Sequence, residues 1–352
     1  MATQARRLPL PTLAGSLPTL LTQALAGLLV LLVVTWLGVN LVKTPEEFYR
    51  LFLIGLTNGA IYGLVALGYS LVYGILELIN FAHGDVFMLG GMGIATLVAT
   101  FGLTATDSDA LLWPLVILML IAVMAFCAAI NTTIEIVAYR RLRHAPRLAP
   151  LITAIGMSFI LQNIGLVWKG ARPTSVESIL PRGEMFTIGG VAYTWDKFIV
   201  LLFTVPVLFG LILLVQRTRQ GKAMRATAQD RDAAAMMGIN VNRTISFTFF
   251  TAGALAGAAA LLYALYITNI RYDEGFRLGL IAFTAAVVGG IGNLPGAVLG
   301  GLLIAMIEAF NNGLSWVTPG SDWTQSIIFS LLIIILVFRP EGLLGERTPE
   351  GG

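Results

Sequence analysis

Nine residues, Glu77 to Asp85 (ELINFAHGD), hold four side chains able to bind an ion or a polar solute. Glu77, Asn80, His83 and Asp85 stand here between two long apolar runs. Ionisable groups inside a membrane segment are costly and commonly mark an ion or substrate pathway. Two alternatives are therefore open: a satisfied polar turn between two helices, or a re-entrant or broken segment that lines a transport path.

Two further acids fall within apolar runs and need a different explanation. Glu135 precedes Arg140 and Arg141, which predicts an ion pair at the cytoplasmic edge of its helix. Glu308 is followed by two asparagines, and we expect it at the wet outer end of its helix.

The sequence contains no arrangement typical of an enzyme. The two histidines and the single cysteine are too few for a metal site or an internal disulfide. The nearest match to a phosphate loop, at Gly221-Lys222-Ala223, lacks the leading glycine and the hydroxyl residue. No nucleophile elbow is present either. We predict no catalytic residue, no metal and no cofactor in this chain, so any ATP would be bound by partner subunits.

Residues 217–243 (RTRQGKAMRATAQDRDAAAMMGINVNR) combine basic side chains with alanine and methionine. Good helix formers run from Lys222 to Met237, and Gly238 is placed to end a helix. One interpretation is a basic helix anchored by lipid headgroups. The other is a docking helix whose methionine and alanine face fits a groove on a partner protein.

The composition places these segments in a membrane protein. Of the 352 residues, 57% are hydrophobic and only 12% are charged, against roughly 25% in soluble domains. The apolar runs have the length of about 20 residues that crosses a bilayer. Basic loops between these runs account for the net charge of +3, so we expect contact with membrane lipid and no nucleic-acid partner.

We predict an all-α membrane protein with about ten transmembrane helices. The expected spans are 20–42, 50–76, 86–103, 112–137, 150–168, 197–216, 244–268, 278–291, 295–311 and 323–338. The first is interpreted as an uncleaved span, because its signal-like Ala24-Leu25-Ala26 precedes the most apolar stretch. Ten spans are compatible with an inverted repeat of five and five, although the sequence shows no clear repeat.

The basic residues predict that both termini face the cytoplasm. With that orientation, 14 of the 22 lysines and arginines lie inside. These are Arg6, Arg7, Arg140, Arg141, Arg143, Arg147, Arg217, Arg219, Lys222, Arg225, Arg231, Arg243, Arg339 and Arg347. The loop 169–196 then lies outside, and its FTIGGVAYTW stretch is typical of a small β-hairpin.

Glycines recur every four residues, which lets membrane helices approach closely. We expect packing faces at Gly55, Gly59 and Gly63, at Gly253 and Gly257, and at Gly292, Gly296 and Gly300. Six glycines and a proline within residues 287–301 would weaken a continuous helix, which predicts a broken helix beside the transport path. The glycines assigned to broken helices are Gly84, Gly289, Gly290, Gly292 and Gly296.

Several segments together resemble one family. Asp232-Ala233-Ala234 followed by Gly238 is similar to the loop by which ABC importer permeases hold their ATPase subunits, with Asp in place of Glu. The other matching segments are NGAIYGLVALGYSLVYGILELINFAHGD (58–85), LITAIGMSFILQN (151–163), FTAAVVGGIGNLPGAVLGG (283–301) and RPEGLLG (339–345). They resemble the high-affinity branched-chain amino acid permease family over residues 50–345, with 1–49 as an extension carrying an extra span and 346–352 as a cytoplasmic tail.

The resemblance implies an inner-membrane importer with two cytoplasmic ATPases, a second and commonly different permease chain, and a periplasmic substrate-binding protein. The loop 169–196 is a candidate contact for the binding protein. The residues that would couple to the ATPase are Arg225, Gln229, Asp230, Asp232, Ala233, Ala234 and Gly238. For the substrate pathway we select Asn58, Tyr62, Asn80, His83, Gln162 and Asn163.

Three alternatives to amino acid import stay open at this point. Close relatives within the family carry urea or short amides. An ion-coupled secondary transporter would need an ion-binding cluster, for which Glu77, His83 and Asp85 are the candidates. A passive channel would need no docking loop.

Overall fold

The computed structural model describes residues 16–103, 109–143, 145–146, 148–177, 179–181, 183–316 and 318–345. Its helices are α1 (Ser16–Lys43), α2 (Pro45–Leu76), α3 (Ala82–Phe101), α4 (Asp109–Ile134), α5 (Leu148–Lys169), α6 (Trp195–Arg217), α7 (Arg219–Gln229), α8 (Arg231–Met236), α9 (Val241–Ile267), α10 (Glu274–Gly289), α11 (Leu294–Gly313) and α12 (Thr324–Phe338). Short turns of other types cover η2 (Glu135–Tyr139), η3 (Arg140–Leu142) and η4 (Ser321–Trp323).

Among the described residues, eight helices are long and apolar enough to cross a membrane, which confirms the all-α membrane class. They coincide with eight of the ten predicted spans. The other two predicted spans correspond to α1 and α10. Because α10 has 16 residues and rises about 1.5 Å per residue, it is shorter than the hydrocarbon layer.

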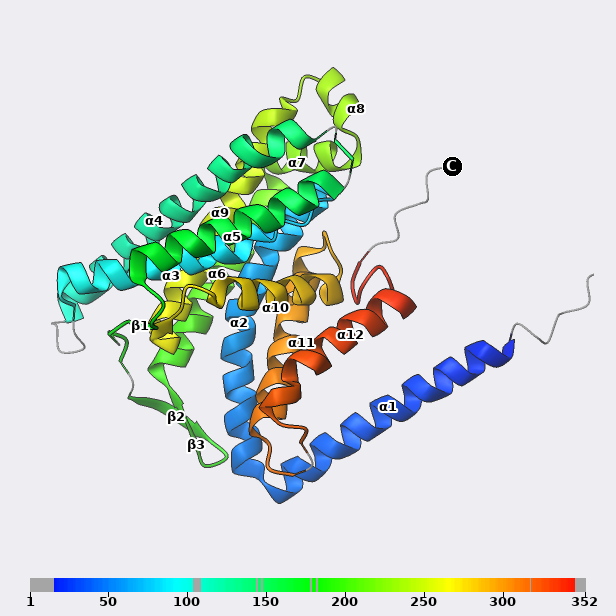
Figure 1. The fold of residues 1–352 in the computed structure, drawn as a ribbon. Helices are drawn as coiled ribbons and strands as arrows, with labels where there is room; N and C mark the ends of the chain where they lie inside the picture. Colours follow the sequence, from blue (N-terminus) through cyan, green and yellow to red (C-terminus); the bar gives the residue numbers. More distant parts are fainter. Residues whose placement is uncertain are drawn as a thin grey trace, which may run out of the picture.

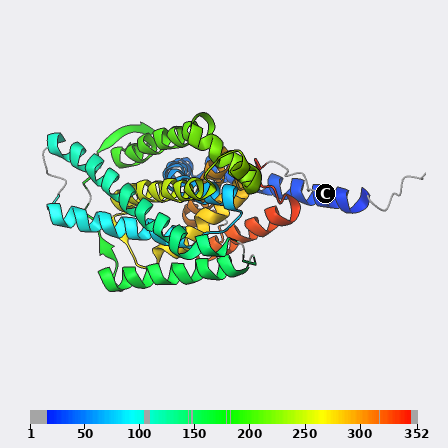
Figure 2. The same ribbon diagram turned by 90° about the horizontal axis from the view of Figure 1, so that it is seen from above.

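The helices form an inner group and an outer group (Figures 1 and 2). In α2, 78% of the most apolar window is buried within the chain, whereas the value for α12 is 11%. Helices α3, α9 and α11 resemble α2 in this respect, and α4, α5 and α6 resemble α12. The outer helices therefore turn apolar side chains outward, as membrane lipid requires.

The predicted glycine faces hold the inner group together. Gly59 lies so close to α11 that an added Cβ would sit 2.8 Å from Leu302 Cα. Gly257 packs in the same way against the backbone of α4, 2.7 Å from Val123 O. Gly300 meets the Ala285 carbonyl of α10. The four-residue spacing thus did predict close helix contacts, because only glycine allows backbones this near.

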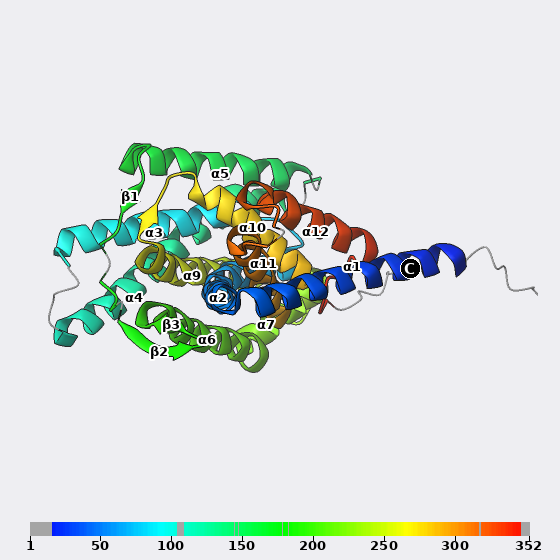
Figure 3. The same ribbon diagram turned by 90° about the horizontal axis from the view of Figure 1, so that it is seen from below.

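Helix α1 leaves the bundle at its Lys43 end and runs away from it (Figures 1 and 3). Its last turns are tied to the loop before α12. The Trp36 indole donates to Trp316 O at 3.0 Å, and the Lys43 ammonium lies 3.6 Å from the Trp316 ring centre. This end of the helix is therefore fixed to the bundle.

The strands are confined to the loops at one end of the bundle. The strands β2 (Glu184–Ile188) and β3 (Val191–Thr194) pair antiparallel around Gly189 and Gly190, which both have positive φ, as a tight hairpin turn requires. This confirms the predicted hairpin. A second pair, β1 (Thr174–Ser175) with β4 (Asn269–Ile270), was not predicted, because its strands lie far apart in the sequence.

Candidate functional site

The segment expected to dock a partner is two helices, which corrects the prediction of one helix from Lys222 to Met237. Helix α7 ends at Gln229, and Asp230 takes an extended conformation with φ −156°. The Asp230 carboxylate accepts the backbone N–H groups of Asp232 and Ala233, both at 2.9 Å. Asp230 is thus the N-cap of α8, and an N-cap residue is itself non-helical.

Helix α8 projects from the end of the bundle (Figure 1). It ends at Met236, with Met237 as its C-cap. Gly238 follows as the predicted terminating glycine, with φ 83° and its N–H on Ala235 O at 3.0 Å. Ala234 is buried against the bundle, whereas Met236 and Met237 are 82% and 83% exposed. Two adjacent exposed methionines form an adaptable apolar surface, which we call the α8 tip.

A hydrogen bond joins this short helix to the end of α2. The Arg231 guanidinium donates to the carbonyl of Leu76, the last residue of α2, at 3.0 Å. That carbonyl is one of the four that a helix end leaves without an internal partner. A cation there also complements the negative end of the helix dipole. Movement of α8 would therefore act directly on α2.

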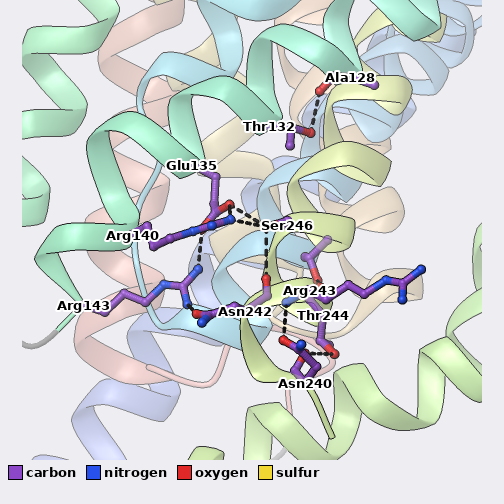
Figure 4. A network of polar contacts seen from close by, with 11 residues as sticks. Ala128, Thr132, Glu135, Arg140, Arg143, Asn240, Asn242, Arg243, Thr244 and Ser246 are labelled. Carbon is purple, nitrogen blue, oxygen red and sulfur yellow. Dashed lines mark hydrogen bonds and ion pairs between the residues drawn. The ribbon is translucent and has the colours of Figure 1, made fainter.

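A second connection runs through a buried acid (Figure 4). Glu135 is fully buried and binds Arg140 at 2.9 Å and also Arg143. The Ser246 hydroxyl of α9 donates to Glu135 at 2.7 Å, and Arg143 donates to Asn242. Because α9 follows α8 after four residues, this network joins the segment that carries α7 and α8 to the end of α4.

The partners of Glu135 correct part of the prediction. Arg140 does pair with it, but the second partner is Arg143, whereas Arg141 is exposed. Residues 135–139 form a π-turn, in which a residue faces the one five positions later. This places Arg140 over Glu135 and turns Arg141 away.

The remaining residues selected for coupling lie on the same two helices. Arg225 and Gln229 are exposed on α7, and the Arg225 guanidinium donates to Val215 O. Asp232 is exposed in the first turn of α8, and Ala233 beside it is half-buried. The structure thus brings all seven selected residues into one projecting unit.

The polar segment ELINFAHGD divides between a short linker, residues 77–81, and the first turn of α3. Asn80 is buried in the linker, accepts from Tyr139 at 2.8 Å and donates to Asn131. His83 and Asp85 lie buried in the first turn of α3. Asp85 accepts from Ser158 of α5.

Four buried polar atoms near this turn have no hydrogen-bond partner in the described part of the chain. They are the two ring nitrogens of His83, Oδ1 of Asp85 and the hydroxyl of Tyr69. The Tyr69 ring packs against His83 with centres 4.8 Å apart. Glu77 stands away from them as an exposed residue, so the three groups proposed for an ion site do not form one cluster.

The other pathway candidates lie on two helices. Tyr62 of α2 donates to the half-buried Glu308 of α11 at 2.7 Å. Glu308 is therefore bound by a protein side chain, whereas the sequence predicted a solvated residue. Asn58 stands half-buried one turn before Tyr62. On α5, Gln162 donates to Ser158, but Asn163 is exposed and bonds to its own helix. The six candidates therefore do not line one common surface.

The glycine-rich segment is a four-residue turn, Gly290 to Asn293, between α10 and α11. Gly289 ends α10, Gly290 and Gly292 have positive φ, and Gly296 lies in the first turn of α11. Gly84 is instead inside α3, where an added Cβ would collide with Gly275 O of α10.

Sequence reasoning missed what holds this turn. Leu343 and Leu344 donate their N–H groups to Val288 O and Gly289 O at 2.9 Å, so residues 339–345 cap the end of α10. Asn293 donates back to Leu344 O at 2.7 Å. The conspicuous RPEGLLG motif was the only signal for this contact.

Comparisons with known proteins identify the family of this chain. Residues 51–337 match the family described as branched-chain amino acid transport system / permease component. The high-affinity branched-chain amino acid transport system permease protein BraD of Pseudomonas aeruginosa is 41% identical, over 87% of this chain and 99% of its own length. The corresponding protein LivH of Escherichia coli is 35% identical, over 84% and 95%.

A more distant relative is the autoinducer 2 import system permease protein LsrD of Salmonella paratyphi B. It is 27% identical, over 75% of this chain and 80% of its own length. The family match and the two higher identities cover most of the chain. The chain therefore belongs to the branched-chain amino acid transport system permease component family, and it is a multi-pass permease subunit of an ABC importer, a class that works with ATPase and substrate-binding partners.

Proposed function

We propose that this chain carries branched-chain or related amino acids into the bacterial cytoplasm, driven by ATP that separate subunits hydrolyse. The amino acid assignment rests on the names of BraD and LivH. LsrD carries the name of a different cargo, so relatives at this distance differ in what they transport. Urea and short amides are the competing substrates to be tested.

One observation carries the coupling proposal: the α8 tip is exposed while the rest of α8 is held to the bundle. Met236 and Met237 project outward, and Arg231 fixes the same short helix to Leu76. A docked helix of this kind fits a groove in a partner by its apolar face. We assign that groove to a cytoplasmic ATPase subunit, with both termini of this chain on the same side of the membrane.

The full assembly in this proposal has two ATPases, a second related permease and a periplasmic binding protein. ATP would be bound by the ATPases and not by this chain. The hairpin of β2 and β3 supports a contact with the binding protein, because it stands at the end of the bundle away from α8 (Figure 1). Closure of the ATPase pair would move α8 as a rigid body and, through α2 and α9, switch access between the two sides.

For the substrate path we propose the α2 surface at Asn58 and Tyr62 together with Glu308 of α11. The Tyr62–Glu308 hydrogen bond gives this surface an acceptor for an ammonium group. Asn80 and His83 are kept as candidates that would act only after the helices move, because they are buried inside the bundle, and the half-buried Gln162 of α5 is kept with them.

The test is purification of the complex from native membranes in mild detergent. Replacing Met236 and Met237 by Gln should reduce the co-purifying ATPase at least tenfold, because the docking face loses its apolar surface. Trp323→Gln is the matched control, because Trp323 is also an exposed apolar residue, at 61%, but does not belong to α8. This variant should leave the ATPase yield unchanged. Equal ATPase recovery with the methionine variant would overturn the coupling assignment.

A further inference from the structure

The bundle contains a cavity of about 440 Å³ at the end that carries α8. It lies where α2 ends, where α4 passes into η2 and η3, and where α5 begins. This volume is in the range of small-molecule sites, about 300 to 1,000 Å³. The pathway candidates do not line it, so the proposed transport route gives it no role.

One arginine of the cavity wall is largely buried. Arg143 is among the lining residues, and its side chain is 11% exposed. Two of its nitrogens bind Glu135 and Asn242, and Nε is buried without an acceptor in the described residues. Because Nε has almost no accessible surface, a ligand in the cavity does not reach it, and Arg143 contributes its positive charge to the wall.

Two arginines and two acids line this wall: Arg143 and Arg231, and Glu77 and Glu135. Glu135 already binds Arg140 and Arg143, whereas Arg231 makes no ion pair in the described part of the chain. Burial, and the charges of Arg140 and Arg231, lower the pKa of Arg143, while Glu135 acts in the opposite direction. An anion in the cavity would therefore be stabilised at Arg231, with the charge of Arg143 on the same wall.

The cavity also presents an unpaired acid. Glu77 lines it, is exposed, and its side chain makes no ion pair or hydrogen bond in the described part of the chain, although its backbone N–H donates to Tyr73 O. Its backbone is left-handed, with φ 53° and ψ 32°. Such a conformation is strained for a residue with a Cβ and is found preferentially at functional positions.

The rest of the wall is apolar. Leu78, Ile79, Leu142, Leu148 and Leu151 supply most of it. The cavity thus offers donors for an anion, an acceptor for a cation, and an apolar surface between them. A zwitterion with an apolar side chain has this combination of groups.

We propose that this cavity is an inhibitory site for the free, apolar amino acid that has reached the cytoplasm. The carboxylate would bind at Arg231, with the charge of Arg143 on the same wall, the ammonium at Glu77, and the side chain against the leucines. This inference rests on the proposed function, because it takes its ligand from the transported class and its side from the proposed orientation.

The effect on transport follows from the position of Arg231. The same guanidinium that lines the cavity holds α8 to Leu76 O, the end of α2. A carboxylate bound to Arg231 would add a further contact to this junction and so favour the resting position of α8. Accumulated product would then slow the importer from the inside.

Binding is measured first, with tritiated L-leucine and the purified full-length chain in lipid nanodiscs. Glu77→Gln should weaken binding about tenfold, as loss of one charge-assisted hydrogen bond does. Ala145→Phe, at a lining residue, should abolish binding by filling the cavity. Arg141→Gln removes an exposed neighbouring charge and should bind as the parent does. No leucine binding, or equal binding by all four proteins, overturns the site.

Transport is measured next in proteoliposomes that contain the co-purified complex, trapped ATP and increasing internal leucine. Internal leucine should slow both uptake and ATP hydrolysis relative to an empty lumen, and Glu77→Gln should raise the half-inhibiting concentration about tenfold. If the rate of ATP-dependent uptake does not change with internal leucine, the proposed inhibition is overturned, but the proposed function is not. Absence of ATP-dependent uptake into an empty lumen contradicts the proposed function instead. The same rates can be compared in liposomes with different anionic lipid contents. If uptake by the variants depends on the anionic lipid content and not on internal leucine, the cavity binds a lipid headgroup and the amino acid site is overturned.

Discussion

Asp230 determines where the docking helix begins. Its carboxylate accepts two backbone N–H groups, so α8 starts with its first donors satisfied although it has only six residues. So short a helix is not stable by propensity alone. The cap and the Arg231 contact with α2 together explain why it forms.

We predict that Asp230→Ala destabilises α8 by about 1 kcal/mol, the usual cost of a lost N-cap. Amide hydrogen exchange over residues 231–237 should then become roughly fivefold faster, measured by mass spectrometry. Asp230→Asn is the control, because asparagine caps equally well, and it should exchange at the parent rate. If both variants exchange equally fast, the carboxylate has another role.

The charge of Glu135 stabilises the bundle by pairing with a buried arginine. It is fully buried and compensates Arg143, which is itself largely buried. We expect Glu135→Ala to cost about 3–5 kcal/mol, because it leaves a buried charge without a partner. A large fall in the thermal unfolding temperature in detergent would report this.

Arg50→Gln provides the comparison for that measurement. It breaks the Arg50–Glu47 pair, in which the arginine side chain is 58% exposed. Exposed pairs contribute at most about 1 kcal/mol. The prediction fails if the two variants lower the unfolding temperature by similar amounts.

At the scale of elements, the contact of α2 with α11 depends on glycine, because a side chain there would keep the two helices apart. Gly59→Ala would bring a methyl group within 2.8 Å of the Leu302 backbone, where nothing can move aside. Overpacking of this kind costs about 1–3 kcal/mol. A lower unfolding temperature and a lower yield of folded protein should follow.

Gly156 of α5 serves as its matched control. An added Cβ there would meet nothing within 4 Å, so Gly156→Ala should be neutral or slightly stabilising. Both changes are Gly to Ala within a membrane helix. Similar losses in the two variants would mean that helix propensity or lipid contact, and not packing against α11, limits stability.

The membrane helices could be predicted from sequence because length and hydropathy are local properties. The hairpin and the glycine faces could be predicted for the same reason. The break at Asp230 was missed, because the alanines and methionines on both sides favour one continuous helix. The break forms because the Asp230 carboxylate bonds to nearby backbone N–H groups, and residue types alone do not show whether an aspartate does this. The contact of residues 339–345 with α10 was missed because it joins distant segments.

The candidate site could be predicted only in part. The seven residues proposed to couple to the ATPase were selected by resemblance, and the structure places them on α7 and α8, at Asp230 between them, and in the turn that follows α8. The contacts that join this site to the membrane helices were not predicted. They are the hydrogen bond of Arg231 with Leu76 and the contacts of Glu135 with Arg143 and Ser246. These contacts depend on how helices pack, which no pattern within one helix encodes.

At the scale of the whole molecule, the two ends of the bundle should face opposite sides of the membrane. Phe186→Cys on the β2 hairpin and Met237→Cys at the α8 tip place thiols at these ends. The native Cys127 is buried and should stay unlabelled. In intact cells a membrane-impermeant maleimide should react with Phe186→Cys alone, and labelling of Met237→Cys would reverse the proposed orientation.

In the proposed mechanism, ATP hydrolysis in separate subunits moves helices of this chain through the α8 tip, Arg231 and the end of α2. The most direct test is a thiol-reactive photo-cross-linker on Met237→Cys in native membranes, with Trp323→Cys as the control. We predict a Met237 adduct with a chain that carries a nucleotide-binding motif, and none from Trp323. A Met237 adduct only with lipid, or with no protein in a complex that still transports, would contradict the central claim that α8 is the docking element.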